Sequence, residues 1–368
     1  MIEVYGKHNT ALVFTDELED AARTQIQTLC SQAFCQGSKI RVMPDVHAGA
    51  GCTIGATMTI GDKVCPNLVG VDIGCGMETV RLDARRLELA KLDKVIRERI
   101  PSGFSARNTP HPMADEIDLS QLRWQKGINL DRAYRSIGTL GGGNHFIEVG
   151  KGENEALYLV VHSGSRQLGL EIAKAYQAAG HDQLKEKSSV PRDLAYVSGP
   201  LLADYLHDMS LAQHFAALNR RTMVREVLKG MKVDAVEQFT TVHNYIDMAE
   251  GILRKGAVSA KAGERLLIPI NMRDGSLICV GKGNPDWNQS APHGAGRLMS
   301  RSQAKRSFTV SEFKKQMRDV YTTSVGAHTL DECPMAYKRM EAILKHIGPT
   351  AEVVETLRPM YNYKAGEE

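Results

Sequence analysis

The chain has 368 residues, of which 42% are hydrophobic and 24% charged, and its formal net charge at pH 7 is only +3. This is an ordinary globular composition, and the small net charge does not by itself indicate a nucleic-acid-binding protein, so any basic patch must be local. Seven cysteines without disulfide-scaffold spacing, no signal-peptide pattern and no apolar run of roughly 18 residues predict a cytoplasmic protein that does not cross a membrane.

The first elements alternate between strand and helix patterns. Residues 1–14 are expected to form a short strand pair. A helix is expected next, because Asp16 and Glu19 have capping-box spacing and apolar residues then recur at three- and four-residue steps. From residue 41 to residue 78 the sequence is glycine-rich and β-like, which predicts backbone packed closely around a site. The polar residues there are Asp45, His47, Asp72 and Cys75.

The middle of the chain contains a second glycine cluster and one clear buried strand. Residues 86–137 return to helix and loop patterns, and glycines gather again in 138–148. The apolar run 156–161 predicts a buried strand that delivers the polar stretch 162–166 at its end, where α/β sheets often place functional groups. The segment 201–231 is expected to be a helix whose methionines are packing residues.

The last third alternates strands with short helices. Strands are expected at 266–270 and 276–280, and Thr309 and Glu312 form a capping-box pattern before a late helix. One further helix is expected near the end of the chain. No repeat or linker is visible, and glycine-framed polar clusters extend from residue 45 to residue 364. If they form one site, residues 1–368 make up a single domain.

The stretch 288–306 centres on His293, which lies between a proline and a glycine. Proline biases the preceding backbone toward an extended form, and glycine permits a close approach to a ligand. A helix beginning near Ala295 would place Arg297 and Arg301 on one face, where two guanidinium groups suit a phosphate. A loop histidine followed by a solvated basic helix is the alternative that this stretch alone leaves open.

Five residues are candidate metal ligands, because each lies among glycines or small polar residues and offers a carboxylate, thiolate or imidazole. Such a mixture suits manganese, iron or zinc, and it could hold two ions if the thiolate bridges them. The alternative is that the cysteine is a small buried apolar residue and that the histidines only satisfy hydrogen bonds. The five are Asp72, Cys75, His145, His162 and His243.

Four basic residues lie just after a glycine or within a turn of small residues. Together with metal ions they could neutralise two phosphate groups, one on a nucleotide and one at the end of a polymer. Basic residues more often form solvated surfaces, which remains the alternative for each of them. The four are Arg166, Lys255, Arg297 and Arg301.

Nine motifs, in order along nearly the whole chain, resemble those of the RtcB family of RNA-splicing ligases. They are VMPDVH (42–47), VGVDIGCGM (69–77), GNHFIE (143–148), HSGSR (162–166), HNY (243–245), RKGAVSA (254–260), GKGNP (281–285), HGAGRLMSR (293–301) and PMAYK (334–338). The resemblance implies an α+β fold, a single large domain with mixed sheets around a central metal-binding cleft.

The resemblance also implies a GTP- and manganese-dependent RNA ligase, acting in tRNA splicing or RNA repair. Such an enzyme joins an RNA 3′-phosphate or 2′,3′-cyclic phosphate to a 5′-hydroxyl, with an archease-type helper protein as a candidate partner. It would be expected to act as a monomer, with two manganese ions and GTP as cofactors. GMP would be carried on a histidine as a phosphoramidate, a form in which a nucleophilic side chain divides one difficult transfer into two.

Roles for individual residues follow from the same resemblance. His293 matches the histidine that receives GMP, and Asp45 a residue that acts after guanylylation. The two-manganese ligands would be Asp72, Cys75, His145, His162 and His243, with Cys75 bridging. The nucleotide contacts would be Asn144, Glu148, His293, Gly294, Ala295, Gly296, Tyr337 and Lys364, with Glu148 and Lys364 reaching the guanine and Tyr337 stacking. Phosphates would be held by Arg166, Lys255, Arg297 and Arg301.

The chain departs from the family pattern at several points. It is shorter between His243 and Arg254, residues 268–273 read IPINMR instead of the usual IPGSMG, and Ala-Gly-Glu-Glu follows Lys364. An alanine and a proline also replace the cysteine-containing approach to His293. These differences leave the nucleotide specificity open.

Three alternatives therefore remain. The first is a divergent family member that uses another nucleotide, or that mainly repairs RNA. The second is a manganese-dependent phosphoesterase, which would need the metal ligands but not His293. The third is a non-catalytic RNA-binding relative.

Overall fold

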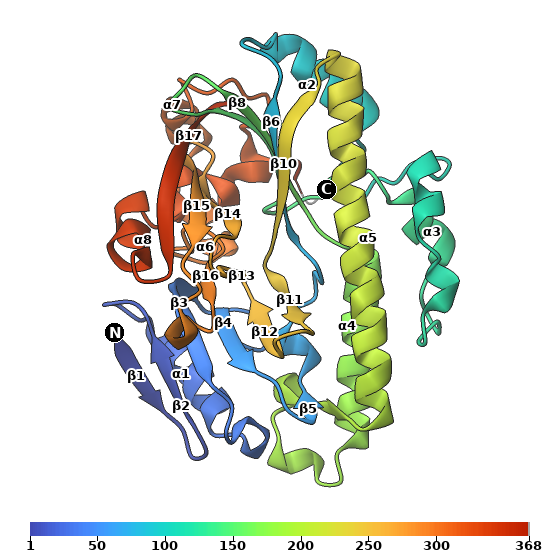
Figure 1. Ribbon diagram of the computed structural model, residues 1–368, viewed down its shortest axis with the longest axis vertical. Helices are drawn as coiled ribbons and strands as arrows, with labels where there is room; N and C mark the ends of the chain where they lie inside the picture. The colour runs from blue at the N-terminus through green and yellow to red at the C-terminus, as the bar shows by residue number, and fades with distance from the viewer. Residues whose placement is uncertain (367–368) are drawn as a thin grey trace.

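A computed structural model describes residues 1–366 of the protein, and Glu367 and Glu368, the end of the tail that follows Lys364, lie outside the described residues. Helices are mixed with several sheets, which confirms the predicted α+β class. In Figure 1 the sheet that contains the N-terminal strands occupies the lower half of the molecule, and a second large sheet occupies the upper half.

The lower sheet has the strand order β1-β2-β3-β4-β12-β11. Its strands are β1 Ile2–Tyr5, β2 Thr10–Val13, β3 Ile40–His47, β4 Ile54–Thr59, β12 Ile252–Lys255 and β11 Asn244–Asp247. β2 pairs with β3 in parallel, and the other neighbours are antiparallel. The predicted N-terminal strand pair and the β-like character of residues 41–78 are confirmed.

The upper sheet has the strand order β10-β6-β8-β7-β17-β15-β14, with antiparallel neighbours throughout. Its strands are β10 Ala235–Val242, β6 Gly76–Leu82, β8 Leu157–Ser163, β7 Phe146–Lys151, β17 Ala351–Tyr363, β15 Gly275–Gly281 and β14 Arg265–Asn271. Every residue of β8 is buried, as its apolar run predicted. Two short pairs complete the strands: β13 Ala257–Ser259 with β16 Ser290–Pro292, and β5 Lys63–Val64 with β9 Val197–Ser198.

The helices are α1 Asp20–Cys30, α2 Leu89–Arg99, α3 Leu130–Arg135, α4 Arg166–Gln183, α5 Pro200–Met231, α6 Arg301–Ser307, α7 Val310–Gln316 and α8 Met340–Ile347. α5 runs along one side of the molecule and contacts α4, β6 and β8 (Figure 1). Proline at its first position fits the helical φ angle, and Lys232 in the left-handed region ends it. Its apolar face is buried as predicted, including Tyr205, Met209, Phe215, Met223, Val227 and Met231.

Two expectations about elements were wrong, and one element was missed. Asp16 and Glu19 do not form a capping box, because α1 begins at Asp20 and Glu19 makes no side-chain cap bond; its carboxylate accepts from the Ala48 amide instead. No helix begins at Ala295, since α6 starts only at Arg301. The long strand β17 was not predicted. By contrast, Thr309 and Glu312 do form the expected capping box of α7.

Within residues 1–366, none of the helices combines the length and the apolar character needed to cross a bilayer. The glycine-framed motifs lie at strand ends and in the loops that follow them, and residues of most of them line one cavity.

Candidate active site and metal centre

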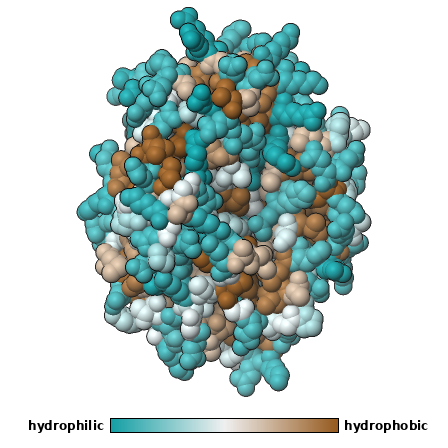
Figure 2. All heavy atoms as spheres, in the orientation of Figure 1, coloured by the Kyte–Doolittle hydropathy of each residue, from teal (hydrophilic) through white to brown (hydrophobic). Residues whose placement is uncertain are grey.

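A cavity of about 1510 Å³ takes its lining from segments between Glu19 and Lys364. Figure 2 shows apolar and uncharged residues gathered toward the middle of one face, with polar side chains around them. Most of the predicted site residues line this one cavity: Asp72, Cys75, Asn144, Glu148, His162, His243, Lys255, His293, Gly294, Ala295, Gly296, Arg297, Arg301, Tyr337 and Lys364. His145 and Asp45 do not line it, but His145 contacts Asp72 and Asp45 contacts His293, which both do.

The candidate metal ligands come from two tight turns and the ends of neighbouring strands. Asp72 and Cys75 lie in the turn before β6, where Gly74 has a φ of +71° and a Cβ would lie 2.8 Å from the backbone of α5. Only glycine fits there, which explains its place between the two ligands. His162 lies in β8, and His243 follows β10 with its amide donating to the Cys75 carbonyl at 3.0 Å.

The five ligand side chains form two groups that share Cys75. One group is Cys75, His162 and His243, the other is Asp72, Cys75 and His145, and within each group the ligand atoms lie within 4.8 Å of one another. Cys75 Sγ lies 3.3 Å from His162 Nε2 and 3.5 Å from His145 Nε2. This is the arrangement in which one thiolate can bridge two cations.

Backbone carbonyls fix the tautomers of two of these imidazoles. His145 Nδ1 donates to the Leu140 carbonyl at 2.9 Å, and His162 Nδ1 donates to the Asn144 carbonyl at 3.1 Å. Nε2 of His162 therefore faces Cys75, and Nε2 of His145 faces both Cys75 and the Asp72 carboxylate, which is 3.0 Å away, as in metal-binding histidines whose other nitrogen is held. Nδ1 of His243 is buried and has no hydrogen-bond partner among the described residues.

The electrostatics of the cluster also fit a cation. Burial lowers the pKa of His162 and of His243 well below the usual range, so both rings stay neutral, the form that binds metal. Burial opposes ionisation of Asp72, but the neighbouring His145 and Cys75 lower its pKa to about 2. Burial, followed by Asp72, raises the pKa of the Cys75 thiol well above its usual range, so a coordinated cation is what would hold it as a thiolate.

His293 stands beside this cluster, immediately after β16, with its ring 4.9 Å from that of His243. Its Nδ1 lies 2.6 Å from Asp45 Oδ2, and its backbone amide donates to the same oxygen at 3.1 Å. Asp45 is fully buried in β3. Since Nδ1–H donates to this carboxylate, the lone pair of a neutral ring lies on Nε2. His293 is therefore oriented as a nucleophile.

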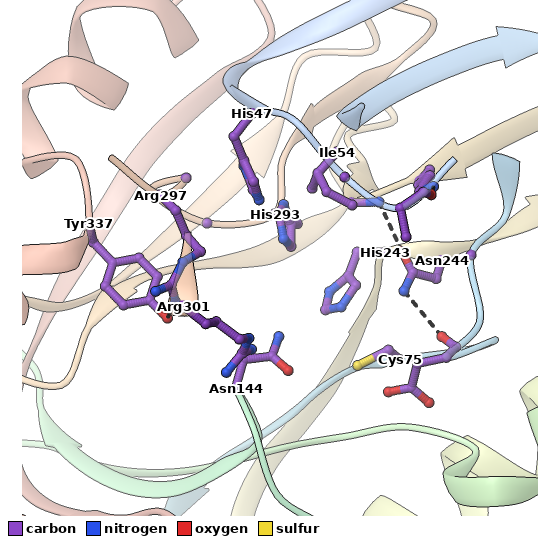
Figure 3. Close-up of a pocket in the computed structure, with 18 of the residues that line it drawn as sticks. His47, Ile54, Cys75, Asn144, His243, Asn244, His293, Arg297, Arg301 and Tyr337 are labelled. Carbon is purple, nitrogen blue, oxygen red and sulfur yellow. Dashed lines mark hydrogen bonds between the residues drawn. The ribbon is translucent and has the colours of Figure 1, made fainter. Parts of the chain in front are cut away.

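The loop after His293 is shaped by its glycines. Gly296 has a φ of +76°, and a Cβ there would lie 2.3 Å from the Asp45 carbonyl oxygen. The chain can therefore pass over Asp45 only with glycine at this position. Figure 3 shows the result: His293 lies between His47 and His243, with Cys75 on one side and Arg297, Arg301 and Tyr337 on the other.

The opposite end of the cavity is built around one buried carboxylate, Glu332. Its two oxygens lie 2.6 Å from Lys364 Nζ, 2.7 Å from Arg301 and 3.2 Å from Arg297. The Tyr337 hydroxyl donates to it at 2.6 Å. Burial would raise the pKa of Glu332, but Lys364, Arg301 and Arg297 together lower it to about 2.

The structure therefore brings Arg297 and Arg301 together without the helix that was expected. Arg297 also donates to the Asp331 carbonyl at 2.7 Å, and Arg301 lies 2.8 Å from the Asp331 carboxylate. Arg297 packs over the Tyr337 ring, 5.1 Å from its centroid. Tyr337 is thus held at the wall of the cavity by both an ion cluster and a cation–π contact.

The two remaining basic candidates are engaged with backbone carbonyls. Lys255 Nζ donates to the Ala50 and Asn67 carbonyls, each at 2.8 Å, in the wall of the cavity, and burial lowers its pKa. Arg166 does not line the cavity: it donates to the Gly103 carbonyl at 2.9 Å and to Thr139 at 3.2 Å. In this structure Arg166 ties loops together behind the Asp72 turn.

Glu148 in β7 also lines the cavity. It is 3% exposed, and burial raises its pKa to about 7 although Asn362 and Lys364 act in the opposite direction. Lys364 Nζ lies 3.3 Å from the Asn144 carbonyl, so Lys364 and Asn144 are neighbours on the same side.

Sequence reasoning missed several residues that support the site. Asn244 donates to the Asp72 carbonyl at 3.1 Å and accepts from the Gly256 amide, and Lys338 donates to carbonyls on both sides of Asp45. Both stand inside quoted motifs, which was the available signal. Arg220 of α5 is fully buried and donates to the Gly74 and Ser163 carbonyls, but nothing in its local sequence marks it. Glu332 was missed as well.

This fold and site define a class of protein: an α+β chain in which a paired metal-ligand cluster lies beside a carboxylate-held histidine and a cationic pocket. A profile of the RtcB family, described as "tRNA-splicing ligase RtcB", matches residues 25–124 and 112–365. The chain is 33% identical over 383 residues to the "RNA-splicing ligase RtcB" of Escherichia coli (strain K12), covering 93% of each. It is 27% identical over 453 residues to the "tRNA-splicing ligase RtcB" of Aeropyrum pernix, covering 95% of the chain and 94% of that relative.

The chain therefore belongs to the RtcB family. This confirms the resemblance found in the motifs and the predicted type of enzyme, an RNA ligase.

Proposed function

We propose that the protein joins RNA 3′-phosphate or 2′,3′-cyclic phosphate ends to 5′-hydroxyl ends, with GTP consumed through a GMP–His293 intermediate. The observation that carries this proposal is the position of His293: Asp45 holds its Nδ1, and its ring lies 4.9 Å from that of a candidate metal ligand, His243. A phosphoesterase would need the metal cluster but would not need a histidine oriented in this way.

The residues of the cluster fit two manganese ions. Asp72, Cys75, His145, His162 and His243 would hold them, with Cys75 shared between two groups of ligands. When bound, the ions would offset the charge of the triphosphate and act as Lewis acids on its oxygens. The mixed oxygen, nitrogen and sulfur donors and the neutral histidines support this assignment.

In the first step His293 Nε2 attacks the α-phosphorus of GTP. A nitrogen–phosphorus bond forms, the bond to the bridging oxygen breaks, and pyrophosphate leaves. Asp45 accepts the hydrogen bond from Nδ1–H and stabilises the positive charge that develops on the ring. Arg297, Arg301 and Lys364 supply positive charge on the side of the nucleotide.

In the second step a 3′-phosphate oxygen of the RNA attacks the phosphorus of GMP and displaces His293, which regains its lone pair. The product is an RNA whose 3′-phosphate is joined to GMP through an anhydride. The 5′-hydroxyl then attacks that 3′-phosphate, GMP leaves, and a phosphodiester is formed. A 2′,3′-cyclic phosphate would first add water to become a 3′-phosphate.

The wider expectations belong to the same proposal. Residues 1–368 act as one catalytic domain, supported by a cavity lined by residues from Glu19 to Lys364. We place the enzyme in the cytoplasm as a monomer, with tRNA splicing or RNA repair as its role and an archease-type helper as a candidate partner. The seven free, buried cysteines support a reducing compartment.

RNA ligation tests the proposal directly. A labelled RNA with a 5′-hydroxyl and a 2′,3′-cyclic phosphate is incubated with the protein, GTP and manganese, beside His293→Ala. The matched control is His214→Ala, which changes an exposed histidine on α5. We expect ligated RNA from the wild type and His214→Ala but not from His293→Ala. Phosphate release that survives His293→Ala, without ligation by the wild type, would instead establish the phosphoesterase.

A further inference from the structure

The base end of the cavity contains buried oxygen atoms that lack partners. Glu148 Oε1, Asn362 Oδ1 and Ser276 Oγ are each buried and accept no hydrogen bond from the described residues. Glu148 is 3% exposed, Asn362 1% and Ser276 1%, and all three line the cavity. A buried polar atom without a partner is costly, so these atoms indicate a ligand that supplies the missing hydrogens.

Glu148 and Asn362 are joined as a cross-strand pair. They stand directly opposite each other in the antiparallel pairing of β7 with β17, and Asn362 Nδ2 donates to Glu148 Oε2 at 2.8 Å. This bond fixes the amide, so that Oδ1 is its remaining oxygen. The same bond occupies Oε2 and leaves Oε1 as the open oxygen of the carboxylate.

Lys364 adds a donor to this pair of acceptors. It follows Asn362 by two residues, lines the same cavity and is 6% exposed. Guanine carries two adjacent donors, N1–H and the 2-amino group, beside the acceptor O6. Adenine has an acceptor at N1 and a donor at position 6. Its N1 would therefore face the acceptor Glu148, and its 6-amino group would face the donor Lys364.

We infer that Asn362 is a second base-reading residue, which acts with Glu148 to select guanine by accepting from its 2-amino group. The inference rests on the proposed GTP-dependent reaction and assigns the specificity of that site. Glu148 Oε1 accepts from N1–H, which hypoxanthine shares, whereas Asn362 Oδ1 accepts from the amino group, which hypoxanthine lacks.

The test compares GTP with inosine triphosphate, which differs by that amino group alone. Dissociation constants are measured with manganese for the wild type and for Asn362→Leu, a substitution of similar shape without the amide. The matched control is Tyr363→Phe at the next residue of the same strand. It removes a hydroxyl that hydrogen-bonds to Ser102. The wild type and Tyr363→Phe should bind GTP about tenfold more tightly than inosine triphosphate, the effect of one buried hydrogen bond.

In Asn362→Leu the ratio should fall to within about twofold, because both nucleotides keep N1–H for Glu148 and neither finds an acceptor at position 362. An unchanged tenfold ratio in Asn362→Leu would mean that Glu148 alone receives both donors, and it would overturn the inference. Failure of the proposed function looks different: no labelled GMP would then appear on His293 of the wild type, whatever the ratio of the two nucleotides.

Discussion

The metal end and the cation end of the cavity lie on opposite sides of His293, and their charges are arranged differently. At the metal end, Asp72, Cys75 and the three ligand histidines form two groups, and within each group the ligand atoms lie within 4.8 Å of one another. Arg166 and Arg220 are near enough to act on Asp72 and Cys75, but their guanidinium groups donate to backbone carbonyls. At the cation end, Lys364, Arg297 and Arg301 share the single carboxylate of Glu332, and Arg301 also pairs with Asp331. The metal end gathers donor atoms that suit an added cation, whereas the cation end pairs its charges only in part and keeps a net positive charge.

This difference indicates how each end would take its ligand. A cation entering the metal end meets donor atoms that already lie within 4.8 Å of one another, and its binding releases the proton of the Cys75 thiol. A phosphate entering the cation end must compete with Glu332 and Asp331 for the same guanidinium groups. We therefore expect tight metal binding and more modest nucleotide binding, each sensitive to different substitutions.

The largest effect is expected from Cys75→Ala. Cys75 belongs to both ligand groups, so its loss damages both ion sites at once. Bound manganese should fall to at most one ion per chain, and ligation should slow by on the order of 10³-fold or more. Metal analysis after dialysis checks the first outcome and an RNA ligation assay the second. Cys279→Ala, a buried thiol away from the cavity, is the control, and two tightly held ions in Cys75→Ala would show that the thiolate does not bridge.

Asp45→Asn should be nearly as severe, and its contact with His293 leads us to expect the effect at guanylylation, one step earlier than the resemblance implied. An amide can donate to His293 Nδ1, which would place the ring hydrogen on Nε2 and remove its nucleophilic lone pair. We expect guanylylation to slow by roughly 10²- to 10⁴-fold while bound manganese stays unchanged. Single-turnover labelling with GTP measures the rate. A normal rate would mean that Asp45 does not orient the histidine.

Glu332→Gln should affect the cation end alone. The substitution removes the buried carboxylate that Lys364, Arg297 and Arg301 share. Its loss should lower the free energy of unfolding by about 3–5 kcal/mol. Urea unfolding should show this loss, whereas manganese affinity should not change. Glu341→Gln, at an exposed site on α8, provides the comparison. Loss of metal binding in Glu332→Gln would show that the two ends are not independent.

The pH dependence of GTP binding should report on Glu148. Its pKa is raised to about 7 by burial, against the effects of Asn362 and Lys364. Only the ionised carboxylate can accept from N1–H without first losing a proton, so affinity should be full above pH 7 and weaken as pH falls. The limiting slope is about tenfold per pH unit. In Glu148→Gln the affinity for GTP should change little between pH 5.5 and 7.5. If the variant shows an equally steep pH dependence, another group is responsible for it.

The smallest effect is expected from Lys305→Ala at the rim of the cation end. Its ammonium lies 3.6 Å from Asp331, and its side chain is 50% exposed. Solvent screens such a pair, so GTP affinity should change by less than about threefold. Isothermal titration calorimetry with GTP measures this change in affinity. A large loss would mean that the phosphate site extends outward along α6.

Much of the site was predictable because its residues stand in compact motifs. Glycines mark the turns before Cys75 and after His293, and the reason is visible in space: Gly74 and Gly296 lie where a Cβ would meet the backbone. The apolar run of β8 and the capping box of α7 were equally clear. Local sequence determines these features, so local reasoning finds them.

What could not be predicted depends on contacts between distant segments. β17 alternates poorly, with a proline and several charges along it, and it is a strand because β7 and β15 lie on either side. Asn362 was missed with it, since nothing local connects it to Glu148. Arg297 and Arg301 meet through Glu332 and not through a shared helix, because the glycine-rich loop after His293 delays α6 until Arg301.

The central claim is that His293 carries GMP, and guanylylation tests it most directly. The protein is incubated with α-labelled GTP and manganese, beside ATP and His293→Ala, and the labelled peptide is identified. We predict an acid-labile, alkali-stable label on His293 that requires GTP and manganese and is absent from His293→Ala. No label on the wild type with two manganese ions demonstrably bound, or a label on another residue, would contradict the account.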